Sequence, residues 1–332
     1  MVKYIKESIA FCLLLNQVMN NSYLLQFCKH KRLWKNFHAA FLLLFLSFPS
    51  SASAFNIVSV QSINIKPYND ALEGYSASCN CEVERFILSE MKDRDVAKEV
   101  LEAKPRVILA IGFDALNTIR SIKNIPIVYA MVLNPGTLTR GHDNIAGVSM
   151  QPSPERQLAV IRRALPGVKS IGLLFDPRNT GGFVKRAQQA SARSGLELIA
   201  REVRSSKDVP AILNSMNGKI NALWMLPDVT VVTPETTEFL LLYSLEQGMP
   251  VITFSEKYLA MGALISLEAD ARDMGRHAWD VTRKVLSGVE AEEIEETYTE
   301  DAIVTVNGKT AKKLGVNMGK EVPERTKTIR EE

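Results

Sequence analysis

Short apolar runs alternate with helical segments along most of this 332-residue chain. The runs fall at 56–60, 84–88, 106–111, 126–130, 170–175, 196–202, 220–226, 250–254 and 264–267. Most of them are continuously apolar, which is typical of parallel strands that are covered on both faces. The alternation therefore predicts βαβ units and an α/β fold built on parallel sheets.

The segments between the runs carry helix start signals. Ser153-Pro154-Glu155 and Thr233-Pro234-Glu235 each place a capping hydroxyl, a proline and an early acid before an apolar-periodic stretch. The elements form two arrays, from 55 to about 145 and from about 147 to 254, followed by a helix at 270–286 and a strand at 302–306.

The N-terminal region has the order of an export signal. A basic stretch at 29–35 precedes an apolar run at 39–48, and the small residues at 51–54 then offer a cleavage site. The run is too short to span a bilayer comfortably, since spanning takes about 20 apolar residues. We expect cleavage after Ala54, with an uncleaved anchor helix as the alternative. Residues 1–28 form an extra N-terminal extension before the signal.

The net charge of +3 is unevenly distributed. Residues 1–54 hold six Lys or Arg and one acid, so the rest of the chain, with 34 bases and 36 acids, is close to neutral. Nucleic-acid binding needs a large basic surface, and we expect no nucleic-acid partner. Cleavage would leave Cys79 and Cys81, which could pair in an oxidising compartment, although the C-x-C ring is tight. A metal site would need more ligands, so structural or incidental cysteines are favoured.

Residues that follow the strands are the candidate ligand contacts, because open parallel sheets bind ligands beyond the carboxyl ends of their strands. After 106–111, Gly112 permits a tight turn, and the helix opening at Phe113 and Asp114 directs free N–H groups at it. That suits a carboxylate or phosphate, although an ordinary strand-to-helix turn has the same sequence. Asn134 follows 126–130 and can bind a ligand or form the turn before Pro135.

The second array offers similar groups. Asp176 and Asn179 follow 170–175 in a polar turn that could hold an amine or hydroxyl, or cap the next helix. Asp228 follows 220–226 and Glu256 follows 250–254, and both are hypothesised partners for a ligand amine. Phe254 and Phe113 could cover an apolar part of a ligand, although a single aromatic side chain more often belongs to the core. Polar groups at several strand ends together favour a site.

No catalytic constellation is found. The chain has no G-x-S-x-G elbow, no H-E-x-x-H and no G-x-x-x-x-G-K-[ST] phosphate loop. We therefore expect a binding protein and not an enzyme, with no cofactor and no metal. The predicted ligand contacts are Gly112, Phe113, Asp114, Asn134, Asp176, Asn179, Asp228, Phe254 and Glu256.

Several stretches carry a family likeness. They are PRVILAIGFDA (105–115), IPIVYAMVLNP (125–135), NIAGVS (144–149), LPGVKSIGLLFDP (165–177), ALWMLPD (222–228), GALISLEAD (262–270) and VNGKTAKKLG (306–315). In this order and spacing they resemble the periplasmic substrate-binding proteins of ABC transporters, in the group with the type I periplasmic-binding fold. The similarity covers most of 55–323.

The resemblance implies two Rossmann-like lobes with parallel sheets, joined by hinge strands that cross at 145–150 and return near 258–263. The first lobe would comprise 55–145 with about 261–300, and the second 146–260, with 301–320 left open as part of it. A C-terminal tail at 321–332 would follow. In similar proteins the turn matching 112–115 meets the ligand carboxylate, and Asp228 matches the strand-end position of the second lobe. Phe113 departs from the small hydroxyl residue common there, and 62–84 is shorter than usual.

The family function is capture of a small solute, amino acids included, and its delivery to an ABC permease in the membrane. The resemblance thus implies a periplasmic protein, and we expect a monomer that closes around its ligand. Two alternatives stay open. One is a periplasmic ligand-sensing partner of a membrane receptor, and the other is a small exported enzyme on the same scaffold.

Overall fold

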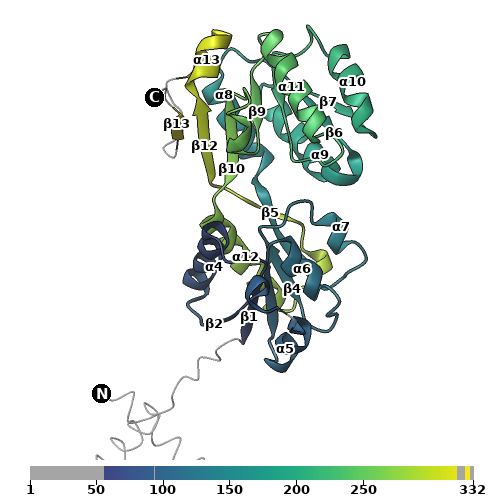
Figure 1. Ribbon diagram of the computed structural model, residues 1–332, viewed down its shortest axis with the longest axis vertical. Coiled ribbons are helices and arrows are strands. Elements are labelled where there is room, and N and C mark those ends of the chain that lie inside the picture. The colour runs from purple at the N-terminus through teal and green to yellow at the C-terminus, as the bar shows by residue number, and fades with distance from the viewer. Residues whose placement is uncertain (1–55, 93, 320–325, 330–332) are drawn as a thin grey trace, which may run out of the picture. The chain divides into compact units, whose positions relative to one another are not determined.

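The computed structural model describes residues 56–92, 94–319 and 326–329, which form two α/β lobes (Figure 1). The predicted signal peptide, its cleavage after Ala54 and the extension before it lie outside the described residues. All nine strands predicted from the apolar runs are present, with ends shifted by one or two residues. The predicted fold class, two lobes with largely parallel sheets, is confirmed.

The first lobe holds a six-stranded sheet in the order β11-β5-β4-β3-β1-β2, in which every pairing is parallel. Its strands are β1 (Ile57–Gln61), β2 (Val83–Ile87), β3 (Val107–Ile111), β4 (Ile127–Ala130), β5 (Ile145–Pro152) and β11 (Thr297–Thr299). Its helices are α4 (Lys66–Cys79), α5 (Val96–Glu102), α6 (Phe113–Ile119), α7 (Gly136–Thr139) and α12 (Ala271–Leu286), with short 3-10 turns η1 (Leu88–Glu90) and η4 (Ala291–Glu293).

The second lobe holds a seven-stranded sheet in the order β13-β12-β10-β9-β8-β6-β7. Among the described strands of this sheet, only the β10–β12 pairing is antiparallel. Its strands are β6 (Ser170–Phe175), β7 (Glu197–Glu202), β8 (Ala222–Trp224), β9 (Val251–Thr253), β10 (Ile265–Ala269), β12 (Ala302–Asn307) and β13 (Thr326–Ile329). Its helices are α8 (Pro154–Ala164), α9 (Pro177–Ser194), α10 (Val209–Ser215), α11 (Pro234–Glu246) and α13 (Gly308–Leu314), with 3-10 turns η2 (Ser206–Asp208) and η3 (Glu256–Tyr258).

Each sheet is covered on both faces, which explains why its strands are continuously apolar. In β1, Val58 and Val60 pack toward α5 and α6, while Ile57 packs toward α4 and α12 on the opposite face. In the second lobe, α8 and α9 cover one face, and α10 and α11 cover the other. The alternation of side chains along a strand divides each lobe into two apolar layers.

Three connections join the lobes: β5 leads into α8, β10 leads into α12, and β11 leads into β12 (Figure 1). The resemblance places the second of these near 258–263, but β10 still pairs with β9 and β12 in the second sheet. Ile265 and Leu267 of β10 are buried in the second lobe, so the chain leaves that lobe only at Asp270, the N-cap of α12. Residues 326–329, inside the expected tail, pair with β12 as β13.

The helix start signals act as the sequence predicts. Ser153 accepts a hydrogen bond from the Arg156 backbone N–H ahead of α8, and Thr233 accepts one from the Thr236 N–H ahead of α11.

A disulfide joins Cys79, the last residue of α4, to Cys81. The pairing left open by the sequence therefore occurs in the structure.

Candidate functional site

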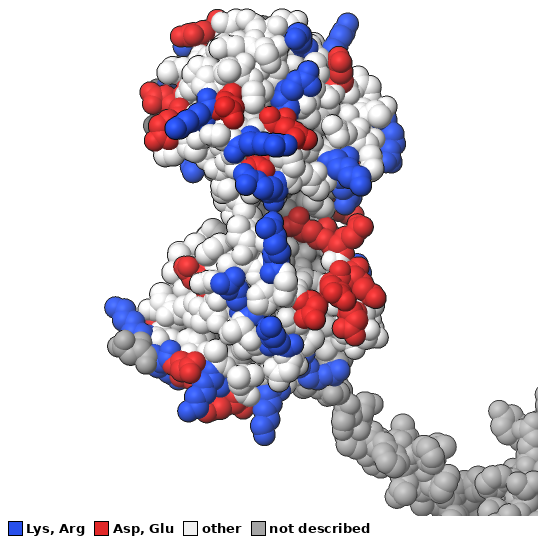
Figure 2. Space-filling view, turned by 90° about the vertical axis from the view of Figure 1, so that its right-hand side faces the viewer, with Lys and Arg blue, Asp and Glu red and all other residues white. Residues whose placement is uncertain are grey.

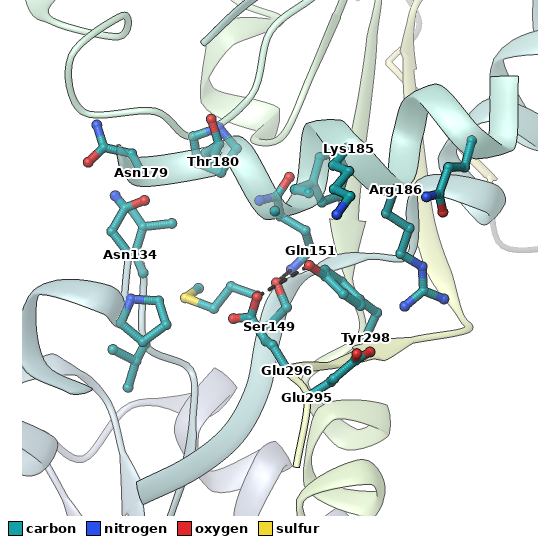
Figure 3. Close-up of a pocket in the computed structure, with 18 residues that line it drawn as sticks. Asn134, Ser149, Gln151, Asn179, Thr180, Lys185, Arg186, Glu295, Glu296 and Tyr298 are labelled. Atoms are coloured by element: carbon teal, nitrogen blue, oxygen red, sulfur yellow. Dashed lines mark hydrogen bonds between the residues drawn. The ribbon is translucent and has the colours of Figure 1, made fainter. Parts of the chain in front are cut away.

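A pocket of about 520 Å³ lies between the two lobes, a volume suited to a small molecule (Figure 3). Its walls come from the loop after β4, the end of β5, the first turns of α9 and the segment that leads into β11. The lining residues are Val132, Leu133, Asn134, Pro135, Ser149, Met150, Gln151, Asn179, Thr180, Gly182, Phe183, Lys185, Arg186, Gln189, Pro227, Glu295, Glu296 and Tyr298.

The start of α9 supplies the polar wall from the second lobe. Asp176 caps the helix by accepting a hydrogen bond from the Arg178 N–H at 2.9 Å, and Pro177 occupies the first helical turn. Asn179 and Arg186 are two helical turns apart and therefore share a face. Lys185 points from this helix into the pocket (Figure 3), and none of the described residues pairs with its ammonium group.

Asp228 holds the start of α9 from behind the pocket, where it is 0% exposed. Its carboxylate accepts hydrogen bonds from Asp176 N (2.8 Å), Thr180 Oγ1 (2.6 Å), Asn179 Nδ2 (3.1 Å), Thr230 N (3.0 Å) and Val231 N (3.4 Å). A carboxylate offers about four lone-pair sites, so protein donors occupy this one fully. Asp228 therefore orients the residues that line the pocket.

Asp176 is buried beside it and is committed to the same turn. Arg178 Nη2 lies 2.6 Å from Asp176 Oδ2, and Thr230 Oγ1 donates to that oxygen at 2.8 Å. The hydrogen-bonded Arg178 guanidinium, helped by Thr230, holds the pKa of Asp176 well below its usual range. The stability that this carboxylate adds is present above its ordinary pKa and is lost as the pH falls below it.

Asn134 faces α9 from the first lobe. The loop after β4 carries two non-glycine residues in the left-handed region, Met131 (φ 59°) and Asn134 (φ 52°). Asparagine tolerates this conformation better than most residues, which accounts for its place in the turn. In the described part of the chain, the Asn134 side chain has no hydrogen-bond partner, and its amide is left for a ligand.

Glu296 lines the pocket and contacts two tyrosines, of which Tyr298 also lines it. Tyr298 Oη donates to Glu296 Oε2 at 3.3 Å, and Tyr129 Oη donates to Glu296 Oε1 at 3.4 Å. The Tyr129 ring lies across Gly147 of β5, where a Cβ atom would overlap it. Burial raises the pKa of Glu296, while the two tyrosine hydrogen bonds lower it by less. Burial also raises the pKa of Tyr129 and of Tyr298.

We expect Glu296→Gln to raise the free energy of unfolding at neutral pH. Because the folded-state pKa is raised, the native protein holds the ionised carboxylate less favourably than the unfolded chain does. That penalty is absent below the unfolded pKa of about 4.3 and grows as the pH rises toward the folded value. Urea unfolding from about pH 4 to 8 should show the advantage of the variant appearing over this range. Glu295→Gln, at the exposed neighbouring position, is the control, and an advantage that grows toward acid pH would contradict the expectation.

A second pocket of about 330 Å³ adjoins the first through shared residues. It is lined by Asn134, Gly136, Thr137, Arg140, Arg178 and Asn179, so Asn134 and Asn179 border both pockets. Figure 2 shows basic and acidic side chains next to one another where the lobes meet. The site therefore carries groups of both signs.

Two of the nine predicted contacts, Asn134 and Asn179, line the main pocket, and Asp176 and Asp228 lie directly behind Asn179. Three predicted residues follow β3 and do not line the pocket, namely Gly112, Phe113 and Asp114. Gly112 (φ 96°) is the N-cap of α6, and a Cβ there would meet Ser62 Oγ at 2.5 Å. Ser62 Oγ also accepts the Ala115 N–H at 2.9 Å, so one free donor of this helix start is occupied.

The remaining predicted residues stand near the same edges but do not line the pocket. Phe113 is 45% exposed on α6, and Asp114 is exposed beside it. Phe254 packs edge-on against Tyr258 at 5.3 Å between ring centres. Glu256 is exposed, and its backbone N–H donates to Glu268 Oε1 at 3.2 Å. Ligand contact by these residues stays a prediction.

The lining also contains residues that sequence reasoning missed. Four of these residues lie on crossing segments, whereas the predicted contacts follow strands. They are Gln151, Glu295, Glu296 and Tyr298. Lys185 and Arg186 both lie on the third turn of α9, and only the seven-residue spacing from Asn179 could have suggested Arg186. Arg186 bonds to Glu155 at 3.1 Å and covers the Tyr298 ring at 5.1 Å.

The described residues also bear on membrane spanning and on metal binding. No helix there has the length and apolar content needed to cross a membrane. The same residues contain no group of three or more His, Cys, Asp or Glu side chains placed to hold a metal ion.

Comparisons with known proteins agree with this architecture. A family model described as ABC transporter substrate binding protein matches residues 88–329. A relative from Clostridioides difficile (strain R20291), a tyrosine-binding protein, is 22% identical over 230 residues, which cover 67% of this chain. The match spans 66% of that relative, just under two thirds of its length.

Two solved structures share the fold. The ligand-free, open structure of a substrate binding protein with adhesive properties from Clostridium difficile is 19% identical, with a TM-score of 0.58 over 83% of this chain and 99% of that one. A conserved domain protein from Vibrio cholerae is 21% identical, with a TM-score of 0.50 over the same shares. At these identities the likeness concerns the fold alone.

Proposed function

This chain belongs to the ABC transporter substrate-binding protein family, as its motifs predict, and we propose that it captures a small amino-acid-like solute between its lobes. The observation that carries the proposal is the pocket, whose walls come from both lobes and hold polar groups that have no partner among the described residues. Asn134 enters from the first lobe and Asn179 from the second. A solute that touched both would favour the closed arrangement of the lobes, which is how such a protein couples binding to a change of shape.

The charges around the pocket favour a solute with groups of both signs. Lys185 and Glu295 both line it, and neither forms an ion pair with another described residue. An amino acid carries a carboxylate and an ammonium group, and each would find a partner of opposite charge here. The tyrosine-binding relative makes L-tyrosine a reasonable first candidate.

The proposed setting is the periplasm, where the closed protein would deliver its solute to an ABC permease. The export signal predicted for residues 1–54 supports this location, and family membership supports the permease partner. We propose that the protein acts as a monomer, because one chain contributes both walls of the pocket.

Thermal unfolding with each of the common L-amino acids tests the proposal. We expect at least one of them to raise Tm, because a ligand at a hundredfold excess over its Kd adds about 2.7 kcal/mol of stability. Sugars of similar size serve as controls and should leave Tm unchanged. If none of the amino acids raises Tm at millimolar concentration, the proposal fails.

A further inference from the structure

We propose that Asn179 selects ligands that carry an amine, above all a primary ammonium group, by accepting a hydrogen bond on Oδ1. The inference rests on the proposed function, because it names the group that the same pocket recognises. It assigns amine recognition to a neutral amide, and not to Asp228 or Glu256, the acids suggested by the sequence.

The Asp228 carboxylate fixes which way the Asn179 amide faces. The Asn179 nitrogen lies 3.1 Å from Asp228 Oδ1, and an ionised carboxylate can only accept hydrogen bonds. Turning the amide over would place its oxygen against that carboxylate and leave two acceptors in contact. The nitrogen must therefore face Asp228.

Thr230 enforces the same orientation. Its hydroxyl proton is used toward Asp176 Oδ2 at 2.8 Å, so the Thr230 oxygen is left to accept. It accepts from the Asn179 nitrogen at 3.0 Å. Both amide hydrogens are thus used within the protein, one on Asp228 and one on Thr230. Only Oδ1 remains to meet a ligand.

That oxygen lies on the open side of the amide. Figure 3 shows the Asn179 oxygen on the side of Asn134 and the nitrogen turned away from it. Asn179 borders both pockets, and within the described residues no donor reaches its Oδ1. A ligand that donates a hydrogen bond here gains a partner without displacing any protein contact.

The rest of the lining favours an ammonium group as that donor. Gln151 Oε1 is buried in the pocket without a hydrogen-bond partner, and a buried acceptor left unpaired is unfavourable. The Glu295 carboxylate also lacks a described partner. An ammonium group has three donors and a positive charge, so it can donate to Asn179 Oδ1 without bringing an acceptor against that oxygen. A carboxylate placed at Asn179 Oδ1 would instead be repelled.

Isothermal titration with matched compounds tests the inference. The probes are L-tyrosine, its des-amino acid 3-(4-hydroxyphenyl)propionate and its amine tyramine, with the corresponding triplet of any amino acid that raises Tm. We expect the two amine-bearing members to bind the unaltered protein at least about tenfold more tightly than the des-amino acid. Asn179→Leu should remove this preference by weakening the amine-bearing members about tenfold while changing the des-amino acid less than about twofold.

Asn134→Leu on the facing lobe is the matched variant, and it should weaken all members of a triplet by a common factor. Equal affinity of the unaltered protein for an amino acid and its des-amino acid overturns the inference without any variant. So does a uniform loss in Asn179→Leu, which would mean that Asn179 acts only on the structure.

The outcomes separate the two ideas. An amino acid that binds without amine dependence leaves the proposed function standing and removes the inference. If an amine binds through Asn179 while no amino acid binds, the inference stands and the proposed function fails. If no amino acid and no amine binds, both fail.

Discussion

Replacing Gly275 with alanine should destabilise the protein by about 3 kcal/mol and lower Tm by about 6–12 °C. Gly275 of α12 lies against α4, and a Cβ atom there would overlap the backbone oxygen of Ala71. Gly74 of α4 faces the backbone oxygen of Arg272 in the same way. Alanine favours a helix over glycine by about 1 kcal/mol, but here the added carbon meets backbone, which can give way only by separating the two helices.

The substitution should destabilise the whole first lobe. The helix α12 belongs to that lobe, although the chain reaches it only after passing through the second lobe. Tyr75 of α4 donates to Thr282 of α12 at 3.0 Å in the buried contact between these helices. Met274, Ala278 and Val281 of α12 fill the apolar layer beneath β1 and β3. Separating the helices would loosen both the hydrogen bond and the layer.

Gly182→Ala is the matched control. Gly182 is also inside a helix, but a Cβ atom there would meet nothing within 4 Å. The same chemical change should therefore be neutral or stabilise by up to about 1 kcal/mol. Urea and thermal unfolding of both variants decide the matter, and similar effects at the two glycines would refute the close-packing argument.

The sequence predicted the strands well, because burial on both faces leaves a continuous apolar run that can be read locally. It did not predict β11 or β13, which span three and four residues. The pairing partner of β11 is β5, about 150 residues earlier, so nothing near Thr297 indicates a strand. For a similar reason, the sequence did not show that the chain returns to the first lobe only at Asp270. Residues 264–267 were predicted as a strand, but the pattern does not say to which sheet they belong.

Part of the candidate site was predicted, because only some of its residues follow strands. Asn134 and Asn179 follow strands directly, and the carboxyl ends of parallel strands meet at one edge, so local reading suffices for them. Gln151 and Glu296 line the pocket only because two crossing segments pass side by side there. Asp228 was predicted to pair with a ligand amine, but protein donors occupy its carboxylate, and their number depends on the folded turn at Asp176 and Thr230.

Removing the Asp228 carboxylate should have the second large effect. Asp228→Ala leaves the N–H groups of Asp176, Thr230 and Val231 and the side chains of Asn179 and Thr180 without their acceptor. A buried donor left unsatisfied costs about 1–3 kcal/mol, and some of these donors will find water at the pocket side. We expect a loss of at least about 3 kcal/mol in the free energy of unfolding.

Asp228→Asn separates the acceptor role from simple loss of volume. Its amide keeps the shape of the carboxylate but turns one acceptor oxygen into an NH₂ donor. In one orientation this donor faces the Asp176 N–H and the Thr180 hydroxyl. In the other orientation it faces the Asn179 and Thr230 nitrogens. The loss should lie between that of Asp228→Ala and zero. Asp143→Asn, at an exposed position, should stay within about 0.5 kcal/mol of the unaltered protein.

A double-mutant cycle shows whether Asp228 acts through Asn179. Because Asn179 Nδ2 donates to Asp228 at 3.1 Å, Asn179→Ala should cost less in the Asp228→Ala background than in the unaltered protein. The expected coupling free energy is about 1 kcal/mol or more, measured by urea unfolding of the four proteins. Strict additivity would mean that the carboxylate does not hold the Asn179 amide, and only the contact with Thr230 would then orient its oxygen.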